Sequence, residues 1–444
     1  MKKRIYILLM AAGAMVSCSD FLEERSNSSL TTPATLEDNQ ALLDRNFMRT
    51  QTCASAEISA TDIYISDADF SGMPLDPEKR LYTWQPDRVA VAEGNDWSNC
   101  FARINVFNTV LHNLDAYQIS GAEGVKGQAL VFRAAAYLEA AQIWCLAYDR
   151  NTAASKQGLP LRLDPDMHLP SVRSSLQQTY EQILSDLHAA EVLLPPVQIS
   201  AVRPSKVTAL GYLARAYLYM GNYEKALLYG RKALALYPAL LDYNALNAGA
   251  SYPVPALNAE ILLPLSMTYS AFLTANQAKI SPELYNSYAA DDLRKTVFFR
   301  KNAAGEVLFK GNYSGGSARS SALATDEVYL TVAESFAQTG EIQEAMNALN
   351  ALLLKRWKAG TFVPFSAQTK EDALLIIRTE RRKELVVRGL RWADVKRYNR
   401  EGAQITLTKT VNGQTFLLPP NDLRYAIAIP EDIIEMTGMP QNER

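Results

Sequence analysis

The stretch of sequence that decides the fold is residues 207–238, which read VTALGYLARAYLYMGNYEKALLYGRKALALYP. Small residues recur in it at three- and four-residue spacing, at Ala214, Ala226, Gly230 and Ala233. Such a stripe lets two antiparallel helices approach each other closely. The length of about 34 residues is that of a tetratricopeptide repeat. The stretch therefore predicts a pair of helices with Gly221 at the turn and Pro238 at the end.

Three further helical pairs follow the same logic. They are residues 125–148 with 174–194, residues 326–355, and residues 369–400. Gly340 and Gly389 are the expected turns of the last two, and a Pro-, Asp- and Gly-rich insertion separates the helices of the first. One repeat cannot bury its apolar face alone. We therefore predict a mainly α fold in which four tetratricopeptide-like helical pairs form a scaffold.

The rest of the chain is not repeat-like. It comprises a loop-rich N-terminal region (20–124), an irregular insertion (243–325), and a C-terminal hairpin and tail (401–444). Irregular segments of this length tend to be functional. We therefore expect residues 18–444 to form a single body whose repeats, within 125–238 and 326–400, support a loop-rich ligand-binding face.

Local signals predict several short elements in these irregular segments. Helices are expected near 36–50 and 97–114, and short strands at 297–300 and 307–309. Residues 405–430 alternate in polarity around Asn412-Gly413, a signal for a type I′ hairpin turn.

The first residues have the layout of a secretory signal. Lys2, Lys3 and Arg4 precede an apolar run that is too short to span a membrane. Small residues then lead to Cys18, which favours a bacterial lipoprotein in which residues 1–17 are removed and Cys18 carries lipid. Met15 stands where leucine is usual, and an ordinary signal peptide with a chance cysteine is the alternative. The lipid would tether a soluble body to a membrane surface.

Composition excludes several classes of function. The formal net charge is −2, and about −5 once the three basic residues of the signal are removed, so the chain lacks the basic character of a nucleic-acid binder. The spacing of Cys53, Cys100 and Cys145 indicates neither a disulfide framework nor a zinc site. Asp164-Pro165-Asp166 is a weak calcium signal, and a solvated loop is the simpler interpretation. We predict no cofactor and no metal.

Catalytic motifs are also missing from the sequence. It contains no HExxH, no G-x-S-x-G, no phosphate-binding loop and no G-x-G-x-x-G. A carboxylate pair for glycoside hydrolysis needs only proximity in space, so sequence alone leaves that possibility open. We predict that the protein is not an enzyme.

Four stretches together carry a resemblance to a known family. They are residues 18–24 (CSDFLEE), residues 97–108 (WSNCFARINVFN), residues 284–294 with 329–334, and residues 380–385 (ERRKEL) continuing in 388–397 (RGLRWADVKR). The last is the most specific. With the tail AIPEDI at 428–433, where Ala428 replaces a proline, they resemble the SusD/RagB family of outer-membrane nutrient-binding lipoproteins.

The resemblance implies a four-repeat helical platform and a function without chemistry. A member of this family sits lipid-anchored at the cell surface, in the outer membrane, as a lid on a SusC-like TonB-dependent transporter. It captures an oligosaccharide, or in RagB-like branches a peptide, and passes it inward. The alternative from another class is a periplasm-facing tetratricopeptide scaffold for lipoprotein assembly, which the long insertions between the repeats disfavour.

Ligand-binding candidates are aromatic residues in the irregular segments, because flat rings pack against sugar faces and neighbouring polar groups bind hydroxyls. Trp84, with Tyr82 and Arg80 beside it, is the leading candidate. The others are Tyr64 with Asp67 nearby, then Tyr269 and Tyr313. Each competes with a packing role, as does Trp97, whose position we expect to be structural.

The basic segment 378–400 has two interpretations. Nine Lys and Arg residues face only three acidic ones within it. An anion or partner site would use them, but ion pairs along and between helices are the simpler explanation. The resemblance also makes this stretch structural.

Overall fold

The computed structural model describes residues 33–197 and 200–444. The predicted signal peptide and Cys18 therefore lie outside the described residues. Within them, no helix combines the length and apolar character needed to cross a membrane.

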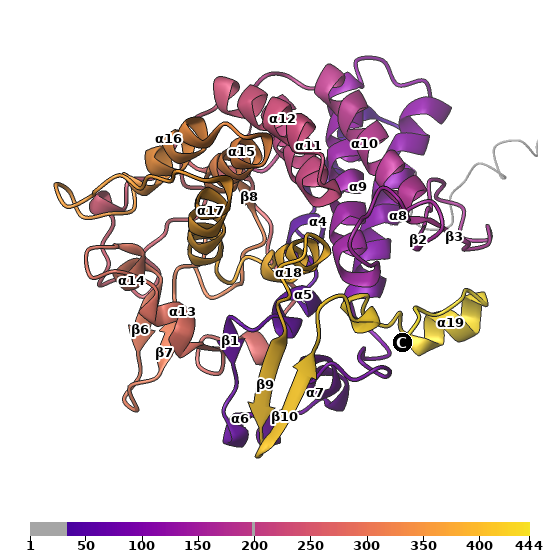
Figure 1. The fold of residues 1–444 in the computed structure, drawn as a ribbon. Helices are drawn as coiled ribbons and strands as arrows, with labels where there is room; N and C mark the ends of the chain where they lie inside the picture. The colour runs from indigo at the N-terminus through magenta and orange to yellow at the C-terminus, as the bar shows by residue number, and fades with distance from the viewer. Residues whose placement is uncertain (1–32, 198–199) are drawn as a thin grey trace, which may run out of the picture.

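Long helices packed in succession form the scaffold (Figure 1). They are α8 (Asp96–Ala116), α9 (Glu123–Trp144), α10 (Leu176–Leu193), α11 (Lys206–Met220), α12 (Tyr223–Leu236), α15 (Thr325–Thr339), α16 (Ile342–Leu353) and α17 (Lys370–Glu384). Each helix from α8 to α12 packs on the next, α12 packs on α15, and α15 packs on both α16 and α17. The prediction of a mainly α, tetratricopeptide-like fold is confirmed.

The turn of the deciding stretch is as predicted. Gly221 has a φ of +73° and ends α11, and the Asn222 side chain accepts a hydrogen bond from the Lys225 backbone N–H to cap α12. Gly230 allows a close approach, since a Cβ built there would lie 2.6 Å from Cγ2 of Val332 on α15. The small-residue stripe thus also joins one helical pair to the next.

The fourth predicted pair is only partly a repeat. Gly389 does turn the chain, with a φ of +75°, between α17 and α18 (Arg391–Arg400). Whereas α17 packs on α15 and α16, α18 packs on α9 and on α5 (Ser55–Ser59). Trp392 is fully buried, and the Gly389 N–H donates to Oε2 of Glu57 at 2.9 Å. These contacts draw α18 toward the N-terminal region instead of along α17.

Short elements cover the scaffold. The remaining helices are α3 (Leu36–Asp44), α4 (Phe47–Thr50), α6 (Asp67–Gly72), α7 (Asp76–Tyr82), α13 (Pro282–Asn286), α14 (Arg294–Val297) and α19 (Glu431–Thr437), with 3-10 turns at Tyr243–Ala245, Ala271–Leu273 and Leu423–Tyr425. The strands are β1 (Ile63–Tyr64), β2 (Gln157–Pro160), β3 (Arg173–Ser175), β4 (Ile261–Leu263), β5 (Lys279–Ile280), β6 (Phe299–Lys301), β7 (Val307–Phe309), β8 (Leu323–Ala324), β9 (Leu407–Val411) and β10 (Gln414–Leu418).

All the described strand pairs are antiparallel. The largest sheet has the order β1-β5-β7-β6 and joins the N-terminal region to the middle insertion. In the predicted hairpin, β9 pairs with β10 around Asn412 and Gly413, both of which have positive φ. This confirms the type I′ turn signal.

The hairpin is attached to the N-terminal region. The side-chain nitrogen of Lys409 donates to the backbone oxygen of Ile58 at 2.6 Å, and the Asn412 N–H donates to Oδ1 of Asp67 at 2.7 Å. Figure 1 shows β9 and β10 beside α6 and α7. The N-terminal region and the C-terminal hairpin, which are far apart in the sequence, therefore lie side by side in the fold.

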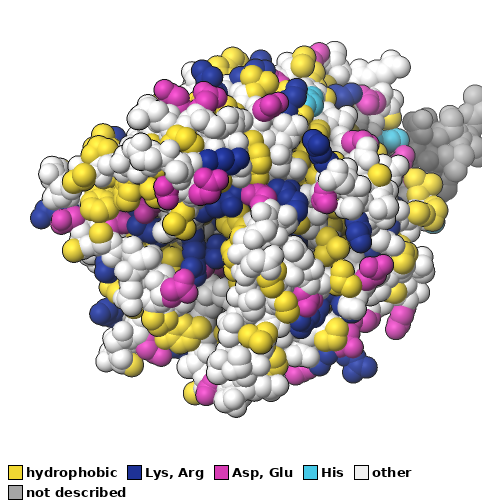
Figure 2. Space-filling view, viewed as in Figure 1, with side chains coloured by type: hydrophobic (Ala, Val, Ile, Leu, Met, Phe, Trp, Pro, Cys, Tyr) yellow, Lys and Arg dark blue, Asp and Glu magenta, His cyan; other side chains and the backbone are white. Residues whose placement is uncertain are grey.

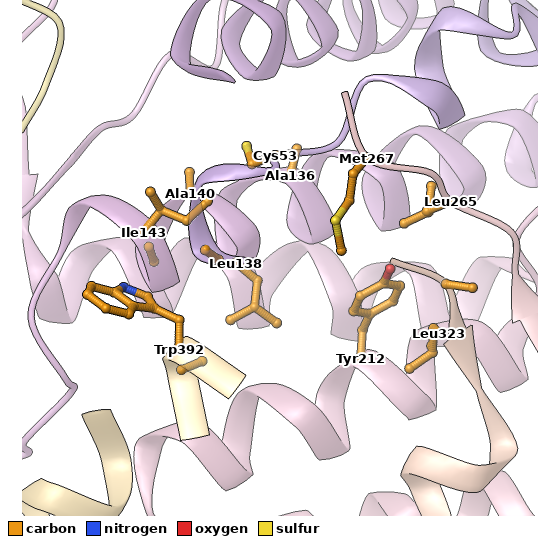
Figure 3. Close-up of a cluster of buried hydrophobic side chains, with 14 of the residues drawn as sticks. Cys53, Ala136, Leu138, Ala140, Ile143, Tyr212, Leu265, Met267, Leu323 and Trp392 are labelled. Atoms are coloured by element: carbon orange, nitrogen blue, oxygen red, sulfur yellow. The ribbon is translucent and has the colours of Figure 1, made fainter. Parts of the chain in front are cut away.

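The core lies between the helices of the scaffold and the loops that cover them. Figure 3 shows side chains of α9, among them Ala136, Leu138 and Ile143, beside Tyr212 of α11 and Trp392 of α18. All five are buried.

The basic segment is structural, as expected, but most of its ion pairs join distant parts of the chain. Arg397 Nη2 lies 2.7 Å from Oε2 of Glu334 on α15, and Arg382 Nε lies 2.7 Å from Oδ1 of Asp62. Burial alone would raise the pKa of Glu334, but Arg397 and Arg378 outweigh it and hold that pKa at about 2. Figure 2 shows Lys and Arg side chains gathered in the middle of the face where α17 lies in Figure 1.

A candidate ligand-binding cleft

The leading sequence candidate, Trp84, is a core residue, and its assignment as an open platform is wrong. Its side chain is 4% exposed, and its indole Nε1 donates to the backbone oxygen of Ser59 at 3.0 Å. The side-chain nitrogen of Lys409 lies 4.9 Å from the Trp84 ring centroid and 3.8 Å from that of Tyr82. Both rings therefore already pack against the hairpin.

Tyr82 and Tyr313 are buried as well, which corrects both assignments. The Tyr82 hydroxyl accepts a hydrogen bond from the Ile65 N–H at 3.2 Å. The Tyr313 hydroxyl donates to Oε2 of Glu260 at 2.6 Å, and the guanidinium carbon of Arg388 lies 4.5 Å from its ring centroid. These tyrosines hold internal networks together and are closed to ligand.

Three other candidates are more accessible but engaged in local contacts. Tyr64 is half-buried in β1, opposite Lys279 of β5. Arg80 forms an ion pair with Asp87, and its Nε donates to the Asp87 backbone oxygen at 2.9 Å. Asp67 accepts the hydrogen bond from the hairpin turn. These residues do not line the cleft described next.

Tyr269 is the candidate that the structure places at an open cleft. Its side chain is 81% exposed, and the cleft beside it has an empty volume of about 780 Å³. Its walls are loop 89–95 and the start of α8 in the N-terminal region, loop 268–270 of the middle insertion, residues of α5 and α7, and residues 427–430. Three segments far apart in the sequence thus meet here, and we call this the Tyr269 cleft.

The Tyr269 cleft contains a carboxylate with free hydrogen-bonding capacity. Burial raises the pKa of Glu78, while a hydrogen bond from Ser270 opposes that rise. Its Oε2 is buried and has no hydrogen-bond partner among the described residues. A buried polar atom without a partner is costly.

The loop that forms the opposite wall is fixed in shape. The Asn95 side chain donates to the Val91 backbone oxygen at 2.7 Å and accepts from the Ser98 N–H at 2.9 Å, which caps α8. Asp96 accepts hydrogen bonds from the backbone of Ala54 and Ser55 at 2.8 and 2.7 Å, and burial raises its pKa to about 6. The wall is therefore pre-organised for binding.

Two buried tryptophans are also part of the lining of the cleft. Trp97 and Trp144 pack edge to face with ring centroids 4.9 Å apart, and they are 4% and 2% exposed. The expectation that Trp97 is structural agrees with this burial. An exposed tyrosine ring and a carboxylate in the lining of one cleft are groups that suit a sugar ring and its hydroxyls.

Sequence reasoning missed Glu78 and the loop before α8. The available signal was the cap pattern Asn95-Asp96-Trp97-Ser98, which marks a helix start. This pattern predicts an ordered start of α8, but it does not predict which residues lie opposite it in the fold. Glu78 lies in an acidic and basic stretch without any pattern that distinguishes it from surface residues.

A second, larger hollow lies elsewhere on α8. It has an empty volume of about 1540 Å³ and is lined by Phe101 of α8, Met167 and Leu169 of the insertion after α9, and Met436 of α19. Its lining is dominated by apolar side chains. The Tyr269 cleft, with its free carboxylate, is the better candidate for a polar ligand.

The helical scaffold and its loop-lined cleft can be compared with known proteins. A family model described as "Starch-binding associating with outer membrane" matches residues 20–218, and the SusD family model matches residues 309–432. The chain belongs to the SusD/RagB family.

Similar proteins support the same grouping. A SusD-like protein P2 of Formosa agariphila is 47% identical over 49 residues, which cover 11% of this chain and 10% of that protein. A SusD superfamily structure from Bacteroides thetaiotaomicron has a TM-score of 0.74 at 22% identity, covering 92% of this chain and all of that one. A sugar-binding protein structure from Bacteroides vulgatus, described as putative, has a TM-score of 0.73 at 18% identity, covering 93% and 99%. The solved structures show a shared fold.

Proposed function

We propose that this protein binds a glycan in the Tyr269 cleft without chemical conversion and delivers it to a SusC-like TonB-dependent transporter in the outer membrane. The observation that carries the proposal is that an aromatic ring that is 81% exposed and the carboxylate of Glu78, whose Oε2 has no partner among the described residues, line one cleft. The family descriptions of starch binding and outer-membrane association support the class of ligand and the location.

The proposed binding mode follows from the geometry of the cleft. The Tyr269 ring packs against one face of a sugar, and Glu78 accepts a hydrogen bond from a hydroxyl. Apolar side chains at the rim, such as Leu75 and Val91, contact the C–H groups of the ring. Because the platform is open, we expect modest affinity that improves when neighbouring sugar units also make contact.

Attachment and delivery complete the proposal. Cys18, outside the described residues, carries the lipid that holds the protein at the outer surface of the outer membrane. From there the protein covers a transporter barrel and releases its ligand inward. The lipoprotein start of the sequence and the family membership support this arrangement.

A peptide is the second candidate ligand, and one observation favours it. Each tryptophan in the described part of the chain is buried or half-buried, so the described surface lacks the large flat platform that suits long glycans. An extended peptide could use Glu78 as an acceptor for a backbone N–H and place a side chain against Tyr269. Direct binding measurements separate the two ligands.

The test is calorimetric titration of the protein against a panel of glycans and a panel of peptides. We expect Tyr269→Ala to weaken binding of the recognised ligand roughly two- to tenfold, since an aromatic contact contributes roughly 0.5–1.5 kcal/mol. Tyr117→Ala is a matched control. Tyr117 is also an exposed tyrosine, but it caps the far end of α8, a 21-residue helix about 30 Å long.

The outcomes decide between the candidates. Undiminished binding by Tyr269→Ala would remove the cleft from the proposal. Binding of peptides with no binding of glycans would establish the second candidate. Equal losses in Tyr269→Ala and Tyr117→Ala would show that the effect is not specific to the cleft.

A further inference from the structure

Two cysteines that are distant in the sequence meet in the core. Sγ of Cys53, Sγ of Cys100 and a carboxylate oxygen of Glu139 all lie within 4.8 Å of one another. Cys53 and Cys100 are 3% and 0% exposed. Figure 3 shows Cys53 beside Ala136 of α9, and Cys100 Sγ lies 3.6 Å from the Ala136 backbone oxygen. The two thiols therefore lie on the same side of α9.

The surroundings favour a neutral sulfur pair over a metal ion. Glu139 already uses both oxygens, because Oε1 accepts from the Cys53 N–H at 2.8 Å and Oε2 accepts from Arg103 at 2.7 Å. The buried Arg103 guanidinium opposes a nearby cation. Burial and the neighbouring Cys100 raise the pKa of the Cys53 thiol, so a free thiolate is disfavoured. A disulfide carries no charge and fits this environment.

We infer that Cys53 and Cys100 form a disulfide bond when the chain folds outside the cytoplasm. This inference depends on the proposed export, because disulfides persist in oxidising compartments. The S–H bonds of both cysteines break and one S–S bond forms. The two electrons and two protons pass to the disulfide of an extracytoplasmic thiol–disulfide oxidoreductase, which becomes a dithiol. The exchange takes place before the core closes over the thiols.

The bond would act on the segment that builds the proposed binding site. The chain between Cys53 and Cys100 contains α7 with Glu78, loop 89–95 and the start of α8, which together supply one side of the Tyr269 cleft. Linking its two ends restricts the unfolded state, and the effect grows with the length of the closed loop. The segment between the two cysteines would thereby be held against α8 and α9.

Cys145 provides an internal control. It is also buried, at 1% exposure, and burial raises the pKa of its thiol. The neighbours that oppose this rise are Arg173 and Lys396, and no other cysteine contributes to the shift. It should remain a free thiol. In the lipidated chain the Cys18 sulfur is already occupied, so the mature protein offers three sulfurs to count.

The experiment counts thiols in the full chain, expressed with its own signal and isolated from the membrane fraction. The protein is denatured and treated with a maleimide-polyethylene glycol, with or without prior reduction. We expect one modified cysteine before reduction and three after it. Cys145→Ala should give no modified cysteine before reduction and two after it. Cys53→Ala should give two modified cysteines both before and after reduction.

Other outcomes overturn the inference. Three modified cysteines without reduction would show that the pair stays reduced. If Cys53 and Cys100 of the wild type become modified after a chelator is added, without any reductant, the pair binds a metal ion instead. Because counting uses denatured wild-type protein, the result stands even where a variant folds poorly.

A thermal melt adds a measure of the effect on stability. Reductant should lower the melting temperature of the wild type by roughly 3–5 °C and leave Cys53→Ala unaffected. An unchanged wild-type melt contradicts a stabilising bond. Ligand titration of the same preparation keeps the two proposals apart, since a protein that binds ligand but has three free thiols before reduction overturns only the disulfide.

Discussion

Replacing Trp84 with alanine is the sharpest test of how the N-terminal region is built. The structure places this side chain in the core, with 4% exposure, against Lys409 of the hairpin and the Ser59 backbone oxygen. The variant removes the ring, the indole hydrogen bond and the surface on which the hairpin rests. We therefore expect a loss of stability with little direct effect on ligand.

The size of the effect follows from the burial. Truncating a buried aromatic residue to alanine costs about 3–5 kcal/mol. The loss of the Nε1 hydrogen bond leaves the Ser59 carbonyl without its donor, which places Trp84→Ala toward the upper part of that range. The unfolding entropy is roughly 2.1 cal/mol/K per residue, so this loss of stability should lower the melting temperature of the whole protein by about 4–5 °C if it unfolds as one cooperative unit.

The assay pairs a thermal melt with calorimetric titration. Trp84→Phe is the control, since it keeps a ring against Lys409 and should recover part of the lost stability. Tyr269→Ala should show the opposite pattern, with a normal melt and weaker binding. A Trp84→Ala protein that melts like the wild type but binds ligand poorly would refute the buried assignment and restore Trp84 as a binding platform.

Three other variants test separate parts of the account. Gly221→Val should lower stability by roughly 1–3 kcal/mol, because φ is +73° there and a Cβ would lie 2.9 Å from Nη2 of Arg400; an unchanged melt would refute the strained turn. Burial raises the pKa of Glu57 from 4.5 to about 7, so its stabilising contribution is complete below pH 4.5 and is lost as pH rises through 7. Glutamine does not titrate, so Glu57→Gln should not lose this contribution. Between pH 5 and pH 8 the free energy of unfolding of the wild type, measured with denaturant, should therefore fall by up to roughly 3 kcal/mol more than that of the variant. Parallel pH profiles of the two proteins would contradict the raised pKa. Cys18→Ala should abolish incorporation of a fatty-acid label and release the protein from membranes, and equal labelling of both proteins would exclude the lipoprotein assignment.

The elements that sequence predicted well depend on neighbouring residues. The stripe around Gly221 fixes two helices and their turn, and Asn412-Gly413 fixes the hairpin, because backbone conformation and helical periodicity are local properties. The helix after Gly389 shows the limit of such signals. Its existence is local, but its direction is decided by contacts with Glu57 and α9, which no spacing in the sequence reveals.

The candidate site was harder to predict for the same reason. Trp84 lies in a polar stretch that looks exposed, but it is buried in the core, where Lys409, from the last tenth of the chain, packs against its ring. Tyr269 was identified among several tyrosines of equal appearance. Glu78 carries no local signal, since its free carboxylate oxygen matters only once loop 268–270 lies beside it.

The attachment of the hairpin to the N-terminal region has a consequence for folding. Lys409 binds the Ile58 oxygen, and the Gly389 N–H binds Glu57, across 351 and 332 positions of sequence. Contacts so distant form slowly, because the entropy of closing the intervening chain must be overcome first. The segment that carries Tyr82 and Trp84 is synthesised long before the hairpin that covers it. In that interval the hairpin does not yet cover the two rings, which leaves an apolar surface to which a chaperone can bind.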